Sequence, residues 1–288
     1  MQDISAIKNR IRSVEGTAKI TKAMQMISTA KMNRALNNYN SNKMYNSTLK
    51  KAMLDIVRNV DEIESPYFTQ AKGDKAAYLI VASDKGMAGG FNHGLFDAAE
   101  AHIKARNAVC IMSVGGKVRE YLAARKRKPD VEFCNSASTV LQFSREIAYS
   151  ILNLFSQGLF DEFYVAYNSF ADGKVTPVID KLLPIEDTAV DGEGENEESS
   201  STYKAQILYD PSPEAVLTAL VPQYLLGTIY GILTESTAAE HFSRMTAMSN
   251  ATVSAEKILG ELKTKYNRAR QERITNEINE ITAGRQNG

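Results

Sequence analysis

The hydrophobic pattern at the C-terminal end of the chain predicts one very long helix. The stretch from Pro222 to Ala283 contains no further proline, and three glycines are its only weak points. A single helix of this length would span about 90 Å at a rise of 1.5 Å per residue. Its apolar residues recur at helical spacing in a narrow stripe: Leu226, Ile229, Leu233, Leu259, Leu262, Tyr266, Ala269, Ile274, Ile278 and Ile281. Such a stripe is typical of a coiled-coil seam, so the helix needs a partner along its length.

The N-terminal part of the chain carries a matching pattern. Two seam segments are visible there: Ile4, Ile7, Ile11 and Val14, and then Leu49, Met53, Ile56, Val60 and Ile63. Between them the stripe consists of small or flexible residues: Ala18, Ala23, Met24, Ile27, Ala30 and Ala35. The middle of the C-terminal stretch is also rich in alanine, which favours close approach of two helices. We therefore predict a long antiparallel two-helix coiled coil formed by the N- and C-terminal helices.

Between these helices the pattern changes to short apolar runs, glycine turns and helical segments. Apolar runs lie at 78–82, 109–114 and 131–134, and helical patterns follow them at 95–106, 117–125 and 138–156. Strand, turn and helix in alternation predict a parallel sheet. Residues 161–170 and 176–185 resemble a hairpin through Asp172-Gly173, and 203–209 alternates like an edge strand. The predicted fold class is α/β, with a central Rossmann-like domain beside the coiled coil.

These patterns divide the chain into three segments, 1–65, 66–210 and 211–288: the N-terminal coiled-coil helix, the central α/β domain and the C-terminal coiled-coil helix. The pair Ser65-Pro66 should end the first helix. The last helix should begin with Ser212 as N-cap, and Pro222 should break or kink it after about two turns.

An acidic segment interrupts the central domain near its end. Residues 186–201 hold seven acidic residues, no basic residue and three consecutive serines. This composition predicts a flexible surface loop.

The net charge of zero conceals a basic N-terminal segment. Residues 1–58 carry eleven Lys and Arg against three acidic residues, a net charge of +8. A solvated helix face and a binding surface both fit this bias; nucleic acid, an acidic membrane surface and an acidic protein all suit such a surface. The longest apolar runs have the length of strands, so we expect no signal peptide and no direct membrane span.

Nucleotide-binding motifs are absent from the glycine turns. The turn after the first strand, Gly86 to Gly90, does not read G-x-G-x-x-G. Gly116-Lys117 imitates the end of a P-loop, but Ile111 replaces the glycine five residues earlier and Val118 replaces the Ser or Thr. We expect these glycines to serve tight turns.

The sequence offers no catalytic cluster either. The three histidines, His93, His102 and His241, have no carboxylate or cysteine at ligand spacing, so we predict no metal and no cofactor. We expect His241 to be a solvated or interhelical histidine. Cys110 and Cys134 lie in apolar runs and are expected to be reduced core thiols. The chain is predicted to bind and move rather than to catalyse.

Five motifs, in order along the chain, resemble the gamma subunit of F-type ATP synthases. They are Ile20-Thr21-Lys22-Ala23-Met24, Ser83-Asp84-Lys85-Gly86 with Gly89-Gly90-Phe91-Asn92, Tyr209-Asp210-Pro211-Ser212-Pro213, Arg244-Met245-Thr246-Ala247-Met248-Ser249-Asn250-Ala251, and Ile274-Thr275-Asn276-Glu277-Ile278. The resemblance runs from about residue 4 to residue 283. Residues 186–201 diverge from the family, and the tail after Ala283 lacks its alanine-rich ending.

The resemblance implies a central rotor shaft of the bacterial enzyme, which couples ion flow through the membrane ring to conformational cycling of the catalytic beta subunits. Its implied partners are the alpha and beta subunits of the catalytic ring, the epsilon subunit and the c-subunit membrane ring, with no nucleic acid. It implies a peripheral location at the cytoplasmic face of the cell membrane. The implied rotor–ring interface comprises Lys8, Arg10, Ile20, Thr21, Lys22, Met24, Arg244, Met248, Ile274, Thr275 and Glu277. The alternative hypothesis is a stand-alone basic coiled-coil binding protein, for example one that binds nucleic acid.

Overall fold

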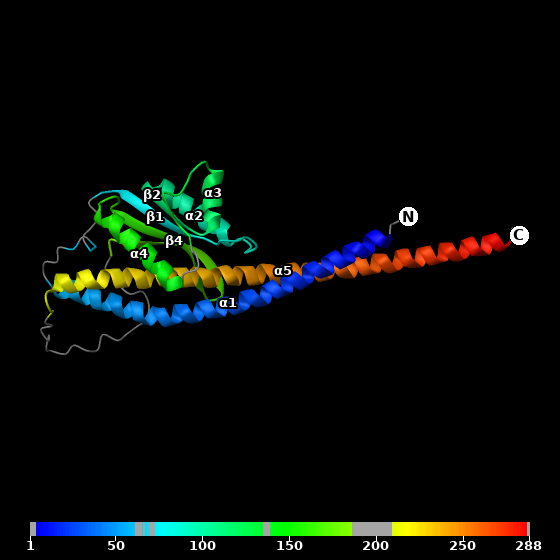
Figure 1. Cartoon of the computed structure of the whole chain (residues 1–288), viewed down its shortest axis with the longest axis horizontal. Coiled ribbons are helices and arrows are strands. Elements are labelled where there is room, and N and C mark those ends of the chain that lie inside the picture. Colours follow the sequence, from blue (N-terminus) through cyan, green and yellow to red (C-terminus); the bar gives the residue numbers. More distant parts are fainter. Residues whose placement is uncertain are drawn as a thin grey trace. The chain divides into compact units, whose positions relative to one another are not determined.

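Two long helices run through both compact units of the chain. The computed structural model describes residues 4–60, 65, 67–68, 73–134, 139–185 and 209–286. The first unit comprises Met1–Lys31, Met87–Gly89 and His241–Gly288, and the second comprises Met32–Gly86 and Gly90–Glu240. Helices α1 (Ile4–Asn59) and α5 (Pro213–Gln286) contribute to each unit (Figure 1). The predicted division into 1–65, 66–210 and 211–288 stays a prediction.

In the first unit α1 and α5 form an antiparallel coiled coil. The hydroxyl groups of Thr21 and Thr252 lie 2.8 Å apart, and the Lys263 ammonium lies 3.9 Å from the Glu15 carboxylate. Because Glu15 lies beside Lys263, the eleven residues back to Ile4 reach about residue 274 on α5. The seam predicted at the end of α5 is accordingly wrong for this chain alone. Ile274 and Ile278 are 45% and 57% exposed, since the first residues of α1 do not extend past about residue 274 of α5.

The middle of the α1 seam also differs from the predicted stripe. Ile27 is 56% exposed, whereas Thr21 and Ser28, spaced by seven residues, are buried. The hydroxyl of Thr21 is within hydrogen-bonding distance of the Ala18 carbonyl, and that of Thr252 of the Met248 carbonyl. Each hydroxyl has one proton, so one threonine donates to the other and the second donates to a backbone carbonyl of its own helix. Bonds of this kind let small polar side chains occupy a buried seam.

The second unit contains a five-stranded sheet among its described residues, in the order β3-β2-β1-β4-β5. The strands are β1 (Lys75–Val81), β2 (Asn107–Val114), β3 (Val131–Phe133), β4 (Glu162–Ala171) and β5 (Lys174–Leu183). Strands β1 to β4 are mutually parallel, and β5 pairs antiparallel with β4. The hairpin turns through Asp172 and Gly173, whose φ angles of 51° and 71° suit the twist of two paired strands.

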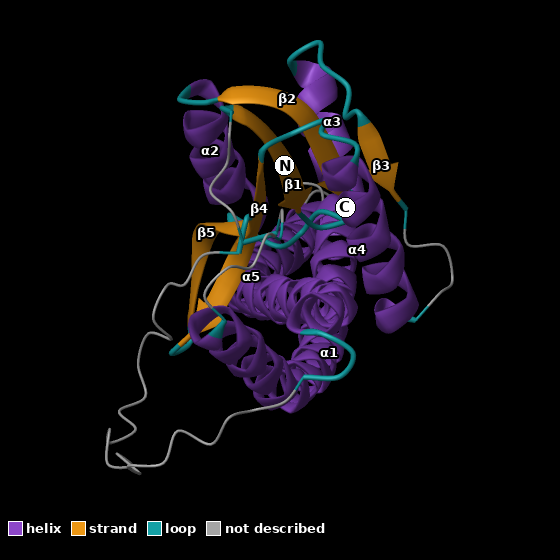
Figure 2. Ribbon diagram, turned by 90° about the vertical axis from the view of Figure 1, so that its left-hand side faces the viewer, coloured by secondary structure: helices purple, strands orange, loops and turns teal. Residues whose placement is uncertain are grey.

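Helices cover both faces of this sheet (Figure 2). Helices α2 (Phe91–Lys104) and α3 (Gly116–Ala124) pack on one face. Helix α4 (Val140–Ser156) packs on the other face together with parts of α1 and α5. Leu79 and Val81 of β1 face the α4 side, while Ile80 faces α2 and α3. The predicted α/β fold, with a Rossmann-like domain and paired terminal helices, is confirmed.

Helix α4 has a cap at each end. The Thr139 hydroxyl accepts the N–H of Gln142 at 3.3 Å, and the Gln142 side chain accepts the N–H of Thr139 at 3.2 Å. At the other end Gly158 has a φ of 70°, and its N–H donates to the Phe155 carbonyl at 3.0 Å. The N–H of Leu159 donates to the Leu154 carbonyl, which completes a Schellman motif. The helix predicted at 138–156 is confirmed, and Gly158 is its C-terminal cap.

Helix α5 starts where the sequence predicts but is not broken at Pro222. Ser212 caps it, since its hydroxyl accepts the Ala215 N–H at 3.2 Å. Pro222 lies inside the helix, so the predicted break is wrong. An internal proline costs about 3 kcal/mol, but full burial of one aliphatic side chain contributes roughly 1.5–3 kcal/mol. Leu217, Val221 and Leu225 are each at most 1% exposed on either side of Pro222, and together they outweigh that cost.

Several remaining expectations fall on the ends of elements. Helix α1 ends at Asn59, a few residues before the predicted stop. The acidic segment 186–201 and the edge strand expected from 203 lie outside the described residues.

Helix α5 contains a window long and apolar enough to cross a membrane, but half of that window is buried, as in a core helix.

The two cysteines occupy different environments. Cys110 is half-buried, and burial, with Asp130 nearby, raises the pKa of its thiol to about 11. Cys134 is exposed, so the expectation of a core thiol is wrong there. Strand β3 ends at Phe133, and therefore Cys134 no longer follows the alternation of the strand.

Candidate functional site

Both helices of the first unit expose large apolar side chains to solvent. On α1 these are Ile20, Met26 and Ile27, which are 62%, 63% and 56% exposed. On α5 they are Val253 and Ile258, which are 64% and 43% exposed. Ile20 and Ile27 are seven residues apart and share one helix face. A two-helix coiled coil in water places polar residues outside, so apolar residues here indicate a surface that contacts a partner.

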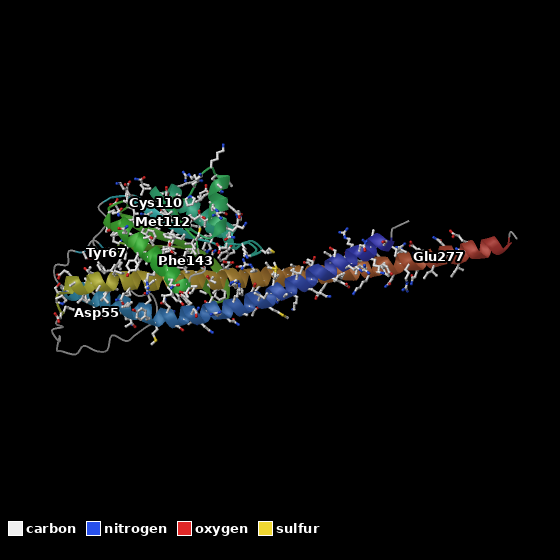
Figure 3. All side chains as sticks on the ribbon, in the orientation of Figure 1. Asp55, Tyr67, Cys110, Met112, Phe143 and Glu277 are labelled. Carbon is white, nitrogen blue, oxygen red and sulfur yellow. The ribbon has the colours of Figure 1, made fainter. Side chains whose placement is uncertain are left out.

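The predicted interface residues separate into an exposed and a buried group. Exposed are Lys8, Arg10, Ile20, Lys22, Ile274, Thr275 and Glu277, while Met24 is half-buried. Thr21, Arg244 and Met248 are 7–8% exposed and lie in the interior of the first unit. Figure 3 shows Glu277 on the last part of α5, where its carboxylate accepts a hydrogen bond of 2.8 Å from the Arg273 guanidinium. The structure therefore does not gather these residues on one face.

Arg244 contacts a histidine that is held neutral. One guanidinium N–H of Arg244 lies 3.3 Å from Nδ1 of His241. Arginine can only donate, so Nδ1 must accept and the ring proton resides on Nε2. Burial, and then the charges of Arg244 and Lys31, lower the pKa of His241 to about 4. Because Lys31 belongs to α1, charges from both helices act on His241; the expectation of a solvated or interhelical histidine stays a prediction.

The basic residues of α1 in the first unit have few carboxylates near them. Lys8, Arg10, Arg12, Lys19 and Lys22 are all exposed. Within the described part of the chain no ion pair is recorded for these five side chains, and Glu15 lies toward Lys263. Unpaired cations on an exposed helix favour an acidic partner.

In the second unit a buried carboxylate joins the two long helices to the sheet. Glu235 of α5 is 7% exposed. Its Oε1 accepts the Ser169 hydroxyl at 2.5 Å and the Phe170 N–H at 2.9 Å, both near the end of β4. Burial, the charge of Glu235 and a hydrogen bond to it raise the pKa of Tyr39 on α1. One carboxylate thus connects α1, α5 and β4.

The same two helices approach closely next to Gly227. The Asn42 side-chain amide donates to the Gly227 carbonyl at 2.8 Å. A Cβ on Gly227 would lie 2.4 Å from Oδ1 of Asn46, so a side chain there would force Asn46 to move. Asn46 also donates to the Thr228 hydroxyl at 3.0 Å, which fixes the register of the pair.

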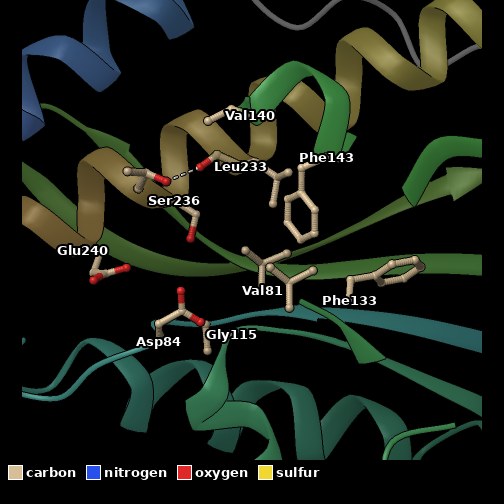
Figure 4. Close-up of a pocket in the computed structure, with 12 residues that line it drawn as sticks. Val81, Asp84, Gly115, Phe133, Val140, Phe143, Leu233, Ser236 and Glu240 are labelled. Carbon is tan, nitrogen blue, oxygen red and sulfur yellow. Dashed lines mark hydrogen bonds between the residues drawn. The ribbon is translucent and has the colours of Figure 1, made fainter. Parts of the chain in front are cut away.

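The cavity at the carboxyl ends of β1 and β2 is unsuited to a nucleotide. Its volume is about 110 Å³, below the 300–1,000 Å³ range of ligand pockets. Figure 4 shows Asp84, Ser236 and Glu240 on one side of it and Val81, Phe133 and Phe143 on the other. The Asp84 carboxylate accepts the Gly116 N–H at 3.1 Å, at the helix start where a phosphate would bind. Two carboxylates at this position repel a phosphate.

Close backbone packing explains the glycine turn at the same place. Gly115 has a φ of 93°, and a Cβ there would lie 2.1 Å from the Ala82 carbonyl oxygen. The glycine therefore serves the turn, as the sequence predicts. Across residues 4–60, 65, 67–68, 73–134, 139–185 and 209–286 no group of three or more potential metal ligands is found.

Known proteins are similar to this sequence over nearly its whole length. The sequence model of a family described as ATP synthase matches residues 3–287. The ATP synthase gamma chain of Acetivibrio thermocellus is 36% identical over 290 residues, which cover 99% of this chain and 98% of that protein. The chain belongs to the ATP synthase gamma-chain family. The gamma chain of Ruminiclostridium cellulolyticum is also 36% identical, over 96% of each protein.

Solved structures of ATP synthases share the fold. A chain of the Euglena gracilis mitochondrial ATP synthase structure with OSCP, F1 and c-ring matches with a TM-score of 0.63 and 14% identity, over 97% of this chain and 92% of that one. A chain of the Tetrahymena thermophila central stalk and c-ring structure matches with a TM-score of 0.59 and 19% identity, over 81% and 99%. The family resemblance drawn from the five motifs is confirmed. Membership of the gamma-chain family favours the shaft hypothesis over a stand-alone basic coiled coil.

Some exposed residues of the first unit are not among those the sequence predicted. Met26, Val253, Ile258 and Met87 expose 43–64% of their surface. Their signal in the sequence was an apolar residue away from the seam. Periodicity alone could not assign it, because the exact seam positions depend on how α1 and α5 face each other.

Proposed function

We propose that this chain is the non-catalytic central rotor shaft of a bacterial F-type ATP synthase. It couples ion flow through the membrane ring to conformational cycling of the catalytic beta subunits, in ATP synthesis or hydrolysis. The observation that carries the proposal is the exposed apolar face of Ile20 and Ile27 on a coiled coil of a gamma-chain family member. A surface of this kind needs a surrounding partner, and a catalytic ring supplies one.

The partners follow from the chemistry of the first unit. The alpha and beta subunits of the ring contact the exposed residues of α1 and α5, with Lys8, Arg10 and Lys22 facing acidic loops. Ile274, Thr275 and Glu277 extend beyond the end of α1 and contact the ring directly. Thr21, Arg244 and Met248 act from inside, by fixing how the two helices face each other.

Rotation of an uneven shaft changes the state of each beta subunit in turn. A subunit pressed by one face of the shaft favours one nucleotide affinity, and another face favours a second affinity. This is a population shift whose ligand is the shaft. In the second unit Glu235 joins both helices to the sheet. This unit binds the epsilon subunit and the c-subunit ring, at the cytoplasmic face of the cell membrane.

A reversible tether between shaft and ring tests the proposal. Cys110 and Cys134 are first replaced by serine, and Ile20→Cys is paired with a cysteine on the facing beta subunit. Ile20 is suitable because 62% of its surface is exposed. Oxidation is expected to stop steady-state ATP turnover while the assembly stays intact, and reduction is expected to restore it. The isolated chain should hydrolyse no ATP.

The matched control places the cysteine on the second unit instead. Lys43→Cys is also exposed on α1 and keeps the same beta-subunit cysteine. It should form no cross-link and leave turnover unchanged under oxidation. Full turnover in a verified Ile20 cross-link would show that the shaft does not rotate at this contact.

A further inference from the structure

A run of basic residues follows α3 in a fixed backbone geometry. Arg125, Lys126, Arg127 and Lys128 are consecutive and exposed. The N–H of Lys126 donates to the Ala123 carbonyl at 3.0 Å, and the N–H of Arg127 donates to the Leu122 carbonyl at 2.9 Å. These two bonds form a Schellman motif with Lys126 at the left-handed position, φ 56°. Glycine is preferred there, so a lysine at this position gains nothing for the backbone.

Three cations of this run are without a carboxylate partner. Arg125 pairs with Glu100 at 2.9 Å, and Lys104 of α2 pairs with the same carboxylate at 2.7 Å. Arg106 pairs with Glu162. Within the described residues no ion pair or side-chain hydrogen bond is recorded for Lys126, Arg127 or Lys128. These three side chains therefore present unneutralised positive charge to solvent.

The run borders an open groove at the amino end of β2. The groove has a volume of about 500 Å³, and its lining includes Lys104, Arg106, Val109, Arg127, Lys128 and Asp130. Val109, one of the lining residues, is 42% exposed. The Asp130 carboxylate is engaged by the Ile111 N–H at 2.7 Å. The lining contains no aromatic side chain, so it lacks the anchors of a specific peptide site.

We propose that Lys126, Arg127 and Lys128 bind an anionic lipid surface. Flexible, unpaired cations around a shallow groove suit a diffuse array of phosphate headgroups, and each cation near such a surface strengthens binding. The proposal rests on the proposed function to the extent that a subunit of a membrane-bound complex works beside lipid. This lipid contact would lie next to the amino end of β2.

Sedimentation of the full chain with lipid vesicles tests this surface. Vesicles of phosphatidylcholine containing phosphatidylglycerol are compared with vesicles of phosphatidylcholine alone, at low and high salt. The chain should bind only the vesicles that contain phosphatidylglycerol, and salt should weaken this binding. The triple variant Lys126→Gln, Arg127→Gln, Lys128→Gln should bind on the order of 100-fold more weakly.

Two further variants separate a defined surface from general charge and from folding. The triple variant Lys8→Gln, Arg10→Gln, Arg12→Gln removes the same charge from α1 and should change vesicle binding by less than about 3-fold. An equal loss in this control would overturn the proposal. Lys126→Gly should leave thermal stability unchanged or higher and still weaken binding by about 5-fold.

The outcome is independent of the shaft proposal. If the 126–128 variant binds anionic vesicles like the unaltered chain, the lipid surface is refuted while the tether test still decides the shaft. If this variant keeps vesicle binding but fails to co-purify with partner subunits, the run binds an acidic protein and the lipid proposal is wrong. If the tether does not stop turnover but the 126–128 variant loses vesicle binding, the shaft proposal is refuted and the lipid proposal stands.

Discussion

Thr21 of α1 and Thr252 of α5 share a hydrogen bond of 2.8 Å between two buried hydroxyl groups. The bond lies in the seam of the first unit, at a position that an aliphatic residue occupies in most coiled coils. It joins the two helices at one register. Four of the five residues from Ile20 to Met24 belong to the proposed interface, and this bond fixes the orientation in which α1 presents them.

Replacing either threonine by valine tests the bond. Thr21→Val or Thr252→Val should each lower the free energy of unfolding by about 0.5–1.5 kcal/mol, because the remaining hydroxyl loses one partner. The double variant should cost less than the sum, since two apolar groups of the same shape can replace a hydrogen-bonded pair. Thermal unfolding followed by circular dichroism measures all three. Strict additivity would show that the hydroxyls do not interact.

The neutral state of His241 predicts a pH dependence of stability. Its folded pKa of about 4 lies below the ordinary histidine value of 6.5, so the unfolded chain takes up the proton first as the pH falls. The stability contributed by the neutral ring should be complete above about pH 6.5 and should be lost as the pH falls from there toward 4.

Two histidine variants check this prediction. His241→Gln keeps a hydrogen-bond acceptor for Arg244 and should flatten the stability profile between about pH 6.5 and 4. His93→Gln is the control, because the His93 side chain is 86% exposed. It should leave the profile unchanged. A profile for His241→Gln that falls as steeply as that of the unaltered chain would contradict the assignment.

Loss of Glu235 should loosen the junction between the long helices and the sheet. Glu235→Ala removes the acceptor of the Phe170 N–H and of the Ser169 hydroxyl, two part-buried groups, which should cost about 1–3 kcal/mol in total. Glu256→Ala, on an exposed turn of the same helix, should change stability by less than about 0.5 kcal/mol. Chemical unfolding of the full chain compares the two. Equal effects would show that the carboxylate does not join the elements.

The exposed isoleucines of α1 should matter for assembly and not for folding. Ile20→Ala with Ile27→Ala should shift the free energy of unfolding of the isolated chain by less than about 1 kcal/mol, since both side chains are more than half exposed. Met53→Ala, at a fully buried position on the same helix, should cost about 2–5 kcal/mol. In the assembled complex the double isoleucine variant should reduce coupled ATP turnover. Unchanged turnover would remove the main support for the proposed contact of Ile20 and Ile27 with the ring.

The sequence by itself determined the elements and the family. Helical spacing from Leu226 to Ala269, the glycine turns after β1 and β2, and the caps at Ser212 and Gly158 are local signals. They act through backbone geometry and neighbouring residues, so they can be recognised without knowing the partner. The family motifs add to this because their order along the chain is itself informative.

The tertiary structure decided which face of each helix is buried. Hydrophobicity placed Ile27 in the seam, but the partner helix selects Thr21 and Ser28, because their small side chains allow close approach and the Thr21 hydroxyl finds a hydrogen-bond partner. It also kept α5 continuous through Pro222, since burial on both sides of the proline outweighs one lost backbone bond. The contacts of Glu235 with Ser169 and Phe170 join segments far apart in sequence. Such contacts leave no periodic trace, and only the folded chain reveals them.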